Sequence, residues 1–172
     1  KKYKEYFPKE YNMYIEPFLG SGAVFFSLQP KEAILSDINK ELINLYVIMR
    51  DNPKELKGQL VYHQERHTKE HYYKIRDVIL TDNLKCAGRL LYLNRACYNG
   101  MYRVNKQGKF NVPIGTKNNF TYDIDQFDQY ANCLKHATLI CGDFYEIINK
   151  AKKNDFIFAD PPYATSGKAN FT

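Results

Sequence analysis

Three short apolar runs in this chain each end at an aspartate, and this pattern constrains the fold more than any other feature. They are residues 33–36 before Asp37, 139–142 before Asp143, and 156–159 before Asp160. Short apolar runs separated by helical stretches are typical of buried parallel strands. Because the carboxyl ends of parallel strands meet at one edge of a sheet, where α/β proteins bind ligands, the three acids are expected to lie together. We therefore predict an α/β fold with a Rossmann-like parallel sheet.

A glycine turn follows the first predicted strand. Residues 14–26 contain a strand, a turn with Gly20 and Gly22, and the start of a helix. Glycines at such a turn let the backbone approach a ligand closely. Phe25 stands where the dinucleotide motif GxGxxG has its third glycine, which argues against NAD. S-adenosylmethionine, a nucleoside without a pyrophosphate, fits better, although an unoccupied strand-to-helix turn would look the same.

Two of the strand-terminal acids are placed to bind that nucleoside. Asp37, which is followed by Asn39, is predicted to accept both ribose hydroxyls. Asp143 is predicted to accept a hydrogen bond from the adenine, while Phe144 covers the face of the ring.

The third acid begins the run Asp160-Pro161-Pro162-Tyr163, which has the parts needed to methylate a planar amine. An aromatic amine attacks a methyl donor poorly because its lone pair is delocalised into the ring. If the Asp160 carboxylate and the Pro161 carbonyl accept the two N–H hydrogens, the lone pair turns out of the ring plane. Consecutive prolines hold that carbonyl in place, and the Tyr163 ring can stack on the base. The same run is also an ordinary strand-ending turn.

The stretch between the second and third predicted strands is too long for a simple crossover. Asn39 is the predicted N-cap of a helix to about Arg50, and helical periodicity continues from Pro53 to about Arg95. Segments 102–105 and 109–113 then predict a β-hairpin in which Gly108 has positive φ. A helix over about 123–136 returns to the sheet. The sequence therefore predicts a helical subdomain, with a hairpin, inserted into the sheet domain.

The inserted segment carries most of the positive charge. The chain has a formal charge of +6, yet no acid lies between Asp82 and Asp123, a stretch with seven lysines and arginines. Four aromatic residues lie among these cations: Tyr92, Tyr98, Tyr102 and Phe110. Cations interleaved with aromatic rings predict a surface for phosphates and bases, and the alternative is a solvated basic face.

Cysteine and histidine spacing predicts no metal site. The four cysteines show no CxxC spacing, so we expect buried thiols in a reduced, cytoplasmic protein. His63, His67 and His71 recur every four residues, but Glu65 is misplaced for a zinc-protease helix and the neighbours are charged. We therefore expect a solvated helix face there. No window approaches the roughly 20 apolar residues of a membrane span, so no membrane partner is expected.

Five sequence blocks, in order, resemble the Dam-type adenine-specific DNA methyltransferases. They are residues 16–22, 36–39, 93–103, 110–115 and 160–163. The resemblance implies a partial S-adenosylmethionine-dependent methyltransferase fold in which Asp160, Pro161, Pro162 and Tyr163 hold a flipped adenine. It implies that the cofactor is bound by nine residues: Glu16, Pro17, Phe18, Gly20, Gly22, Asp37, Asn39, Asp143 and Phe144.

The same resemblance implies that the inserted segment reads duplex DNA, with GATC as the expected site. Tyr98 and Asn99 match side chains that wedge into the duplex beside the extruded base, and Arg103 matches a guanine reader. Met101 and Pro113 match contacts to a thymine methyl, and Arg95 and Lys109 belong to the same surface. Arginine suits guanine O6 and N7, and extrusion is required because the amine of a paired adenine faces its partner base.

The family pattern also includes a Lys-Trp-x-Gly-Gly-Lys-like segment before residue 1 and further strands after the catalytic turn. We therefore expect a fragment, a truncated copy or a complex with the missing remainder, with an unpaired sheet edge. The predicted division is a catalytic part over 1–52, a target-recognition domain over 53–135 and a second catalytic part over 136–172. Alternatives are methylation of the exocyclic amine of cytosine, a DNA-binding module without methyl transfer and, less favoured, an RNA substrate.

Overall fold

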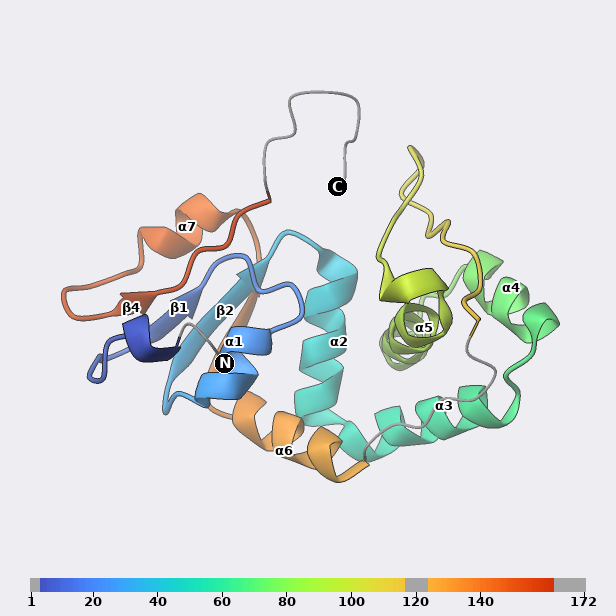
Figure 1. Cartoon of the computed structure of the whole chain (residues 1–172), viewed down its shortest axis with the longest axis horizontal. Helices are drawn as coiled ribbons and strands as arrows, with labels where there is room; N and C mark the ends of the chain where they lie inside the picture. Colours follow the sequence, from blue (N-terminus) through green and yellow to red (C-terminus); the bar gives the residue numbers. More distant parts are fainter. Residues whose placement is uncertain (1–3, 117–123, 163–172) are drawn as a thin grey trace.

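The computed structural model describes residues 4–116 and 124–162 of the 172-residue chain. Four parallel strands form one sheet in the order β3-β2-β1-β4 (Figure 1). They are β1 (Tyr14–Glu16), β2 (Ala33–Asp37), β3 (Ala137–Cys141) and β4 (Phe156–Ile157). The predicted parallel α/β sheet is confirmed. Because β2 and β3 lie on one side of β1 and β4 on the other, the strand order switches between β1 and β4, where open α/β sheets bind their ligands.

The first strand-to-helix turn depends on two left-handed glycines. Gly20 and Gly22 have φ values of +48° and +64°, and α1 (Ala23–Leu28) begins directly after them. A Cβ on Gly22 would lie 2.8 Å from Cε2 of Phe26, so the close packing of α1 on the turn also favours glycine there. The Leu19 N–H donates to the Ser36 carbonyl at 2.8 Å, which attaches the turn to β2.

Helix α2 (Lys40–Asp51) joins the sheet to the inserted segment. The Asn39 side chain accepts hydrogen bonds from the N–H groups of Glu41 and Leu42, so the predicted N-cap is confirmed. The helix buries Ile43, Leu45, Tyr46 and Met49. Figure 1 shows it between the sheet and α5 (Asn83–Ala96), with α6 (Ile124–Leu134) below it in this view. One apolar core therefore continues from the sheet into the insertion.

The insertion is helical, as predicted, and has a second core of its own. After α2 come α3 (Pro53–Glu65), α4 (Lys69–Asp77), α5 and the short 3-10 helix η2 (Tyr98–Gly100). Residues 102–113 then form the predicted hairpin, with an antiparallel bridge between Val104 and Phe110 and a φ of +74° at Gly108. The second core contains Tyr72, Tyr92, Leu93, Ala96, Cys97, Phe110 and Val112.

Two aromatic residues assigned to the nucleic-acid surface lie in this second core instead. Tyr92 has no exposed surface and Phe110 is 6% exposed, whereas Tyr98 and Tyr102 are 47% and 38% exposed. The spacing of aromatic residues among cations did not distinguish the inward face of α5 from its outward face. Arg89, a cation of the same stretch, is likewise engaged within the protein, since it donates to the carbonyls of Ile75 and Arg76 at the end of α4.

The prediction of a solvated histidine face is wrong. His63 is 4% exposed and its Nδ1 lies 3.0 Å from Nε2 of His71, because α3 ends at Glu65 and α4 folds back beside it. The His63 ring stacks on Tyr92 at 4.7 Å, and Nδ1 of His67 lies 2.9 Å from the Tyr92 hydroxyl. The histidines therefore tie α3, α4 and α5 together.

The remaining elements complete the sheet domain. The 3-10 helix η1 (Lys4–Tyr6) precedes β1, and α7 (Phe144–Ile148) follows β3. Helix α6 contacts both α2 and β3. Within the described part of the chain β4 pairs only with β1, and Ile157 is 36% exposed.

All four cysteines are free, and the expectation that their thiols are buried is wrong for Cys141, which is exposed. In the part of the chain that the structure describes, the helices are too short or too polar to cross a membrane.

Candidate cofactor and nucleic-acid site

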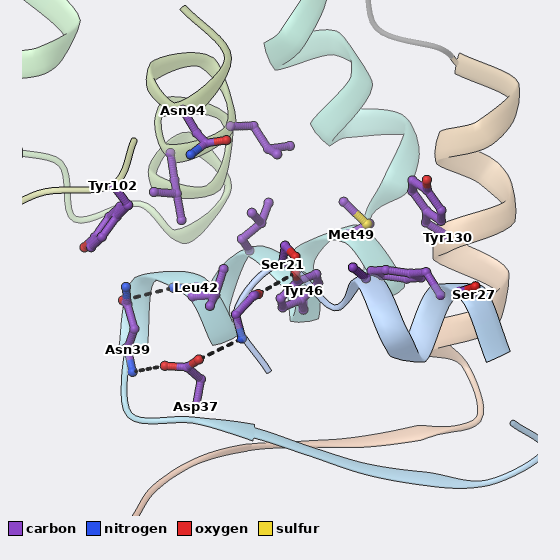
Figure 2. Close-up of a pocket in the computed structure, with 16 residues that line it drawn as sticks. Ser21, Ser27, Asp37, Asn39, Leu42, Tyr46, Met49, Asn94, Tyr102 and Tyr130 are labelled. Carbon is purple, nitrogen blue, oxygen red and sulfur yellow. Dashed lines mark hydrogen bonds between the residues drawn. The ribbon is translucent and has the colours of Figure 1, made fainter. Parts of the chain in front are cut away.

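The Asp37 carboxylate organises the glycine turn at the carboxyl edge of the sheet. Its Oδ2 accepts from the Gly20 N–H at 3.0 Å and its Oδ1 from the Asn39 N–H at 2.9 Å (Figure 2). The Tyr46 hydroxyl donates to the Gly20 carbonyl at 2.9 Å. Each carboxylate oxygen has two lone pairs, so both retain capacity for a ribose hydroxyl. Sequence reasoning predicted the acid but not that it also holds the turn.

Glu16 is a buried acid at the point where the strand order switches. It is 3% exposed, and its Oε2 accepts from the Tyr14 hydroxyl at 2.8 Å. The pKa of the Glu16 carboxyl is raised from 4.5 to about 7, chiefly by burial and to a smaller extent by the negative charge of Asp160. Hydrogen bonds from the Tyr14 hydroxyl and the Phe25 N–H oppose this rise. A cation bound here would relieve the cost of the buried charge.

Pro17 and Phe18 lead from Glu16 toward a second group of predicted residues. Pro17 is buried, and the Phe18 ring lies 5.1 Å from the Phe144 ring, so the structure brings these predicted cofactor residues together. Asp143 caps α7, with its Oδ1 accepting from the Tyr145 N–H at 2.9 Å.

Ile38, which sequence reasoning did not single out, is 78% exposed although it is apolar and lies between Asp37 and Asn39. The sequence did contain a signal for Ile38, because an apolar residue stands between two polar residues at the predicted ligand-binding edge of the sheet. Its side chain offers the kind of surface on which a flat ring packs.

Asp160, Pro161 and Pro162 extend beyond β4 and are exposed. The Phe158 N–H donates to the Ile15 carbonyl at 2.9 Å, which keeps this segment beside β1 as far as residue 158. Asp160 and Glu16 are close enough for their charges to interact. Tyr163, the last residue of the predicted catalytic turn, lies outside the described residues.

A cavity of about 800 Å³ joins the sheet edge to the insertion. Figure 2 shows Asp37 and Asn39 on its sheet side, with Asn94 and Tyr102 of the insertion across from them. Leu42, Leu45, Tyr46 and Met49 of α2 give it an apolar wall. Glu16, Asp143 and Asp160 do not line it, so the cavity adjoins only the glycine-turn side of the predicted cofactor site.

The loop after α5 presents the predicted wedge residues in a fixed shape. Asn99 has a left-handed φ of 55°, and Gly100 follows with a φ of +64°. The Asn94 side chain donates to the Gly100 carbonyl at 3.0 Å, and the Cys97 thiol donates to the Met101 carbonyl at 3.2 Å. Arg95, Tyr98 and Asn99 line one polar cavity of about 530 Å³. These three predicted residues therefore share one surface.

The hairpin is attached to this loop and carries the other predicted DNA contacts. The Tyr98 N–H donates to the Pro113 carbonyl at 2.9 Å, so the wedge loop and the end of the hairpin are adjacent. Met101, Arg103, Lys109 and Pro113 are all exposed. Arg103 Nε donates to Asn111 Oδ1 at 2.8 Å.

Within residues 4–116 and 124–162, no three His, Cys, Asp or Glu side chains are arranged to hold a metal ion. A parallel sheet with a glycine turn and acids at its carboxyl edge places this chain among the α/β proteins, a class that binds its ligands at that edge of the sheet. The family model described as "D12 class N6 adenine-specific DNA methyltransferase" matches residues 1–172. The chain belongs to this family.

Curated relatives agree with that assignment. The chain is 38% identical to a type II methyltransferase, M1.LlaDCHI, of Lactococcus lactis subsp. cremoris, over 91% of this chain and 58% of the relative. It is 36% identical to the type II methyltransferase M.MjaIII of Methanocaldococcus jannaschii, over 91% of this chain and 60% of the relative. It is 35% identical to a DNA adenine methylase of Serratia marcescens, over 92% of this chain and 60% of the relative. The chain thus spans about three-fifths of the length of these relatives.

Proposed function

We propose that the protein transfers a methyl group from S-adenosylmethionine to the exocyclic N6 amine of adenine in duplex DNA, within GATC. The family match supports adenine as the target base. The single structural observation that carries the proposal is the buried Glu16 at the end of β1, which pairs with the strand β4 that leads to Asp160, where the sheet order switches. A buried carboxylate there suits a cationic ligand, and an exposed carboxylate next to it suits an amine.

The residues at the sheet edge fit S-adenosylmethionine. Asp37 has oxygen lone pairs for the ribose hydroxyls, and Gly20 and Gly22 let the backbone approach closely. Ile38, Phe18 and Phe144 offer apolar surface for the adenine ring, with Asp143 at the start of α7. Glu16 balances the positive charge of the ligand. When bound, the cofactor supplies an electrophilic methyl group on a sulfonium.

The catalytic turn prepares the target amine. The Asp160 carboxylate and the Pro161 carbonyl each accept one N–H of the flipped adenine, so the nitrogen lone pair is turned toward the methyl donor. Tyr163 stacks on the base, and Pro162 fixes the backbone between them. With the donor bound, these residues would hold the amine nitrogen in place to take the methyl group in exchange for one proton, which would be lost to solvent. No cysteine nucleophile is needed.

The inserted segment selects the DNA site. Tyr98 and Asn99 enter the duplex beside the extruded adenine, and Arg103 reads a guanine. Met101 and Pro113 contact a thymine methyl, while Arg95 and Lys109 neutralise phosphates. We propose that this target-recognition domain spans residues 53–135, with its own core around Tyr92 and Phe110. Helix α6, at its end, packs on α2 and β3 and therefore connects it to the sheet domain.

The proposal is tested with radiolabelled donor and duplex DNA, followed by mass spectrometry of the nucleosides. N6-methyladenine in GATC duplexes is expected, and N4-methylcytosine would instead support the cytosine alternative. Arg103→Ala should relax the choice of sequence by roughly 5- to 150-fold. Unchanged discrimination against a substituted guanine would contradict the role of Arg103.

A second candidate function is DNA binding without methyl transfer, and the separate core of the insertion favours it. Titration of S-adenosylmethionine in the absence and presence of duplex DNA separates the two. Saturable binding of the donor supports the enzyme, whereas DNA binding with no donor binding supports the binding module.

A further inference from the structure

Arg103 and Asn111 face each other across the hairpin and are joined by three hydrogen bonds. The Asn111 N–H donates to the Arg103 carbonyl at 3.1 Å. In the side chains, Arg103 Nε donates to Asn111 Oδ1 at 2.8 Å and Arg103 Nη2 donates to the Asn111 carbonyl at 3.4 Å. The pair lies directly beside the Val104–Phe110 bridge, on the segment that rises above α5 in Figure 1.

These contacts leave Arg103 with the donors that base recognition needs. A guanidinium has five N–H hydrogens, and Asn111 uses the one on Nε and, at a longer distance, one on Nη2. Both hydrogens of Nη1 and one of Nη2 remain, which is enough for a bidentate pair with guanine O6 and N7. The contact to Nε also restricts rotation of the guanidinium about its long side chain.

The partner of Arg103 is neutral, and this preserves the charge of the guanidinium. None of the five ion pairs among the described residues includes Arg103. A carboxylate in place of the Asn111 amide would hold the Arg103 side chain equally well, but its negative charge would offset the positive charge of the guanidinium. Asn111 itself is held in place, because its neighbours Phe110 and Val112 are buried in the second core.

We propose that Asn111 is a positioning residue for sequence specificity, which holds the Arg103 guanidinium in the orientation that reads a guanine. Ordering a free arginine side chain costs entropy on binding, and holding it in the unbound protein reduces that cost for the correct base. This inference rests on the proposed function, since it assumes that Arg103 contacts a base.

The test measures binding of the full chain to two labelled duplexes by fluorescence anisotropy at one fixed salt concentration. One duplex contains GATC, and in the other 7-deazaguanine replaces both guanines of that palindromic site, one on each strand, which removes their N7 acceptors. The specificity ratio is the Kd for the second duplex divided by the Kd for the first. The unmodified protein is expected to give a ratio of about 5 to 150.

Three variants separate positioning from other roles. Asn111→Ala loses the Oδ1 acceptor, and its specificity ratio is expected to fall at least about threefold. Asn111→Asp keeps an acceptor for Nε, so its ratio should stay near that of the unmodified protein while both Kd values rise. Lys106→Ala removes an exposed cation of the same hairpin, and both Kd values should rise together with the ratio unchanged.

An unchanged ratio for Asn111→Ala overturns the proposal. An equal loss of ratio in the Ala and Asp variants, with a lowered melting temperature in both, also overturns it, because it indicates a structural role. If the unmodified protein binds both duplexes equally, Arg103 does not read N7 and the proposal falls with that role. That outcome differs from failure of the methyltransferase proposal, which is measured by methyl transfer and not by this ratio.

Discussion

Replacing Glu16 with glutamine should stabilise the protein above neutral pH, because it removes a buried negative charge. Glutamine has nearly the same shape and keeps an oxygen that can accept from the Tyr14 hydroxyl. An acid whose folded-state pKa exceeds its unfolded value binds more protons when folded. The contribution of Glu16 to the free energy of unfolding is therefore greatest below pH 4.5 and falls as the pH rises to about 7. A rise in pKa from 4.5 to about 7 corresponds to about 3 kcal/mol.

Urea unfolding of both proteins at a series of pH values from 4.5 to 8.5 measures this effect. The difference in unfolding free energy between Glu16→Gln and the unmodified protein should grow by about 3 kcal/mol in favour of the variant across that range. Glu10 is exposed, so Glu10→Gln is the matched control and should show a flat difference. A difference for Glu16→Gln that does not change with pH would refute the reasoning that burial suppresses the charge.

Four further outcomes are expected. Gly22→Ala should lower the free energy of unfolding by about 1–3 kcal/mol, because its φ is +64° and a Cβ would meet Phe26. In contrast, Gly58→Ala in α3, where a Cβ meets nothing within 4 Å, should raise it by about 0.5–1 kcal/mol. Burial lowers the pKa of His63 to about 4, so its contribution to stability is present above pH 6.5 and is lost as the pH falls to about 4. His63→Gln should reduce that pH dependence by up to about 3 kcal/mol in urea unfolding, with His71 leaving a smaller slope, and a slope as steep as that of the unmodified protein would contradict it. Finally, Asp37→Ala should weaken binding of S-adenosylmethionine at least about tenfold in calorimetry, because it removes the acceptors for the ribose and for the Gly20 N–H.

Local patterns in the sequence were enough to predict the elements that position the site. The strand-terminal acids identified the parallel sheet, Asn39 identified the start of α2, and Gly108 identified the hairpin turn. Each of these features depends on residues close together in the sequence, such as an N-cap side chain and the N–H groups of the following turn. The GxG turn after β1 was predictable for the same reason.

Contacts between segments far apart in the sequence were not predictable in this way. A spacing of four suggested one solvated helix for His63 and His71, whereas their contact depends on a chain reversal between α3 and α4. Tyr92 was assigned to the surface because it lies among cations, but the packing of α5 on α2, α3 and α4 decides which of its faces is buried. The hydrogen bond between Asp37 and the Gly20 N–H likewise joins the end of β2 to the turn after β1, and the sequence does not give the distance between them.

The central claim is that an adenine amine is made reactive at the turn that begins with Asp160. The most direct test compares the full-length protein with its Asp160→Ala variant, by mass spectrometry of nucleosides from a GATC duplex incubated with S-adenosylmethionine. The account predicts N6-methyladenine with the unmodified protein and a loss of at least about a hundredfold in its rate of formation with the variant. Equal rates for the two proteins, or methylation of cytosine in place of adenine, would contradict it.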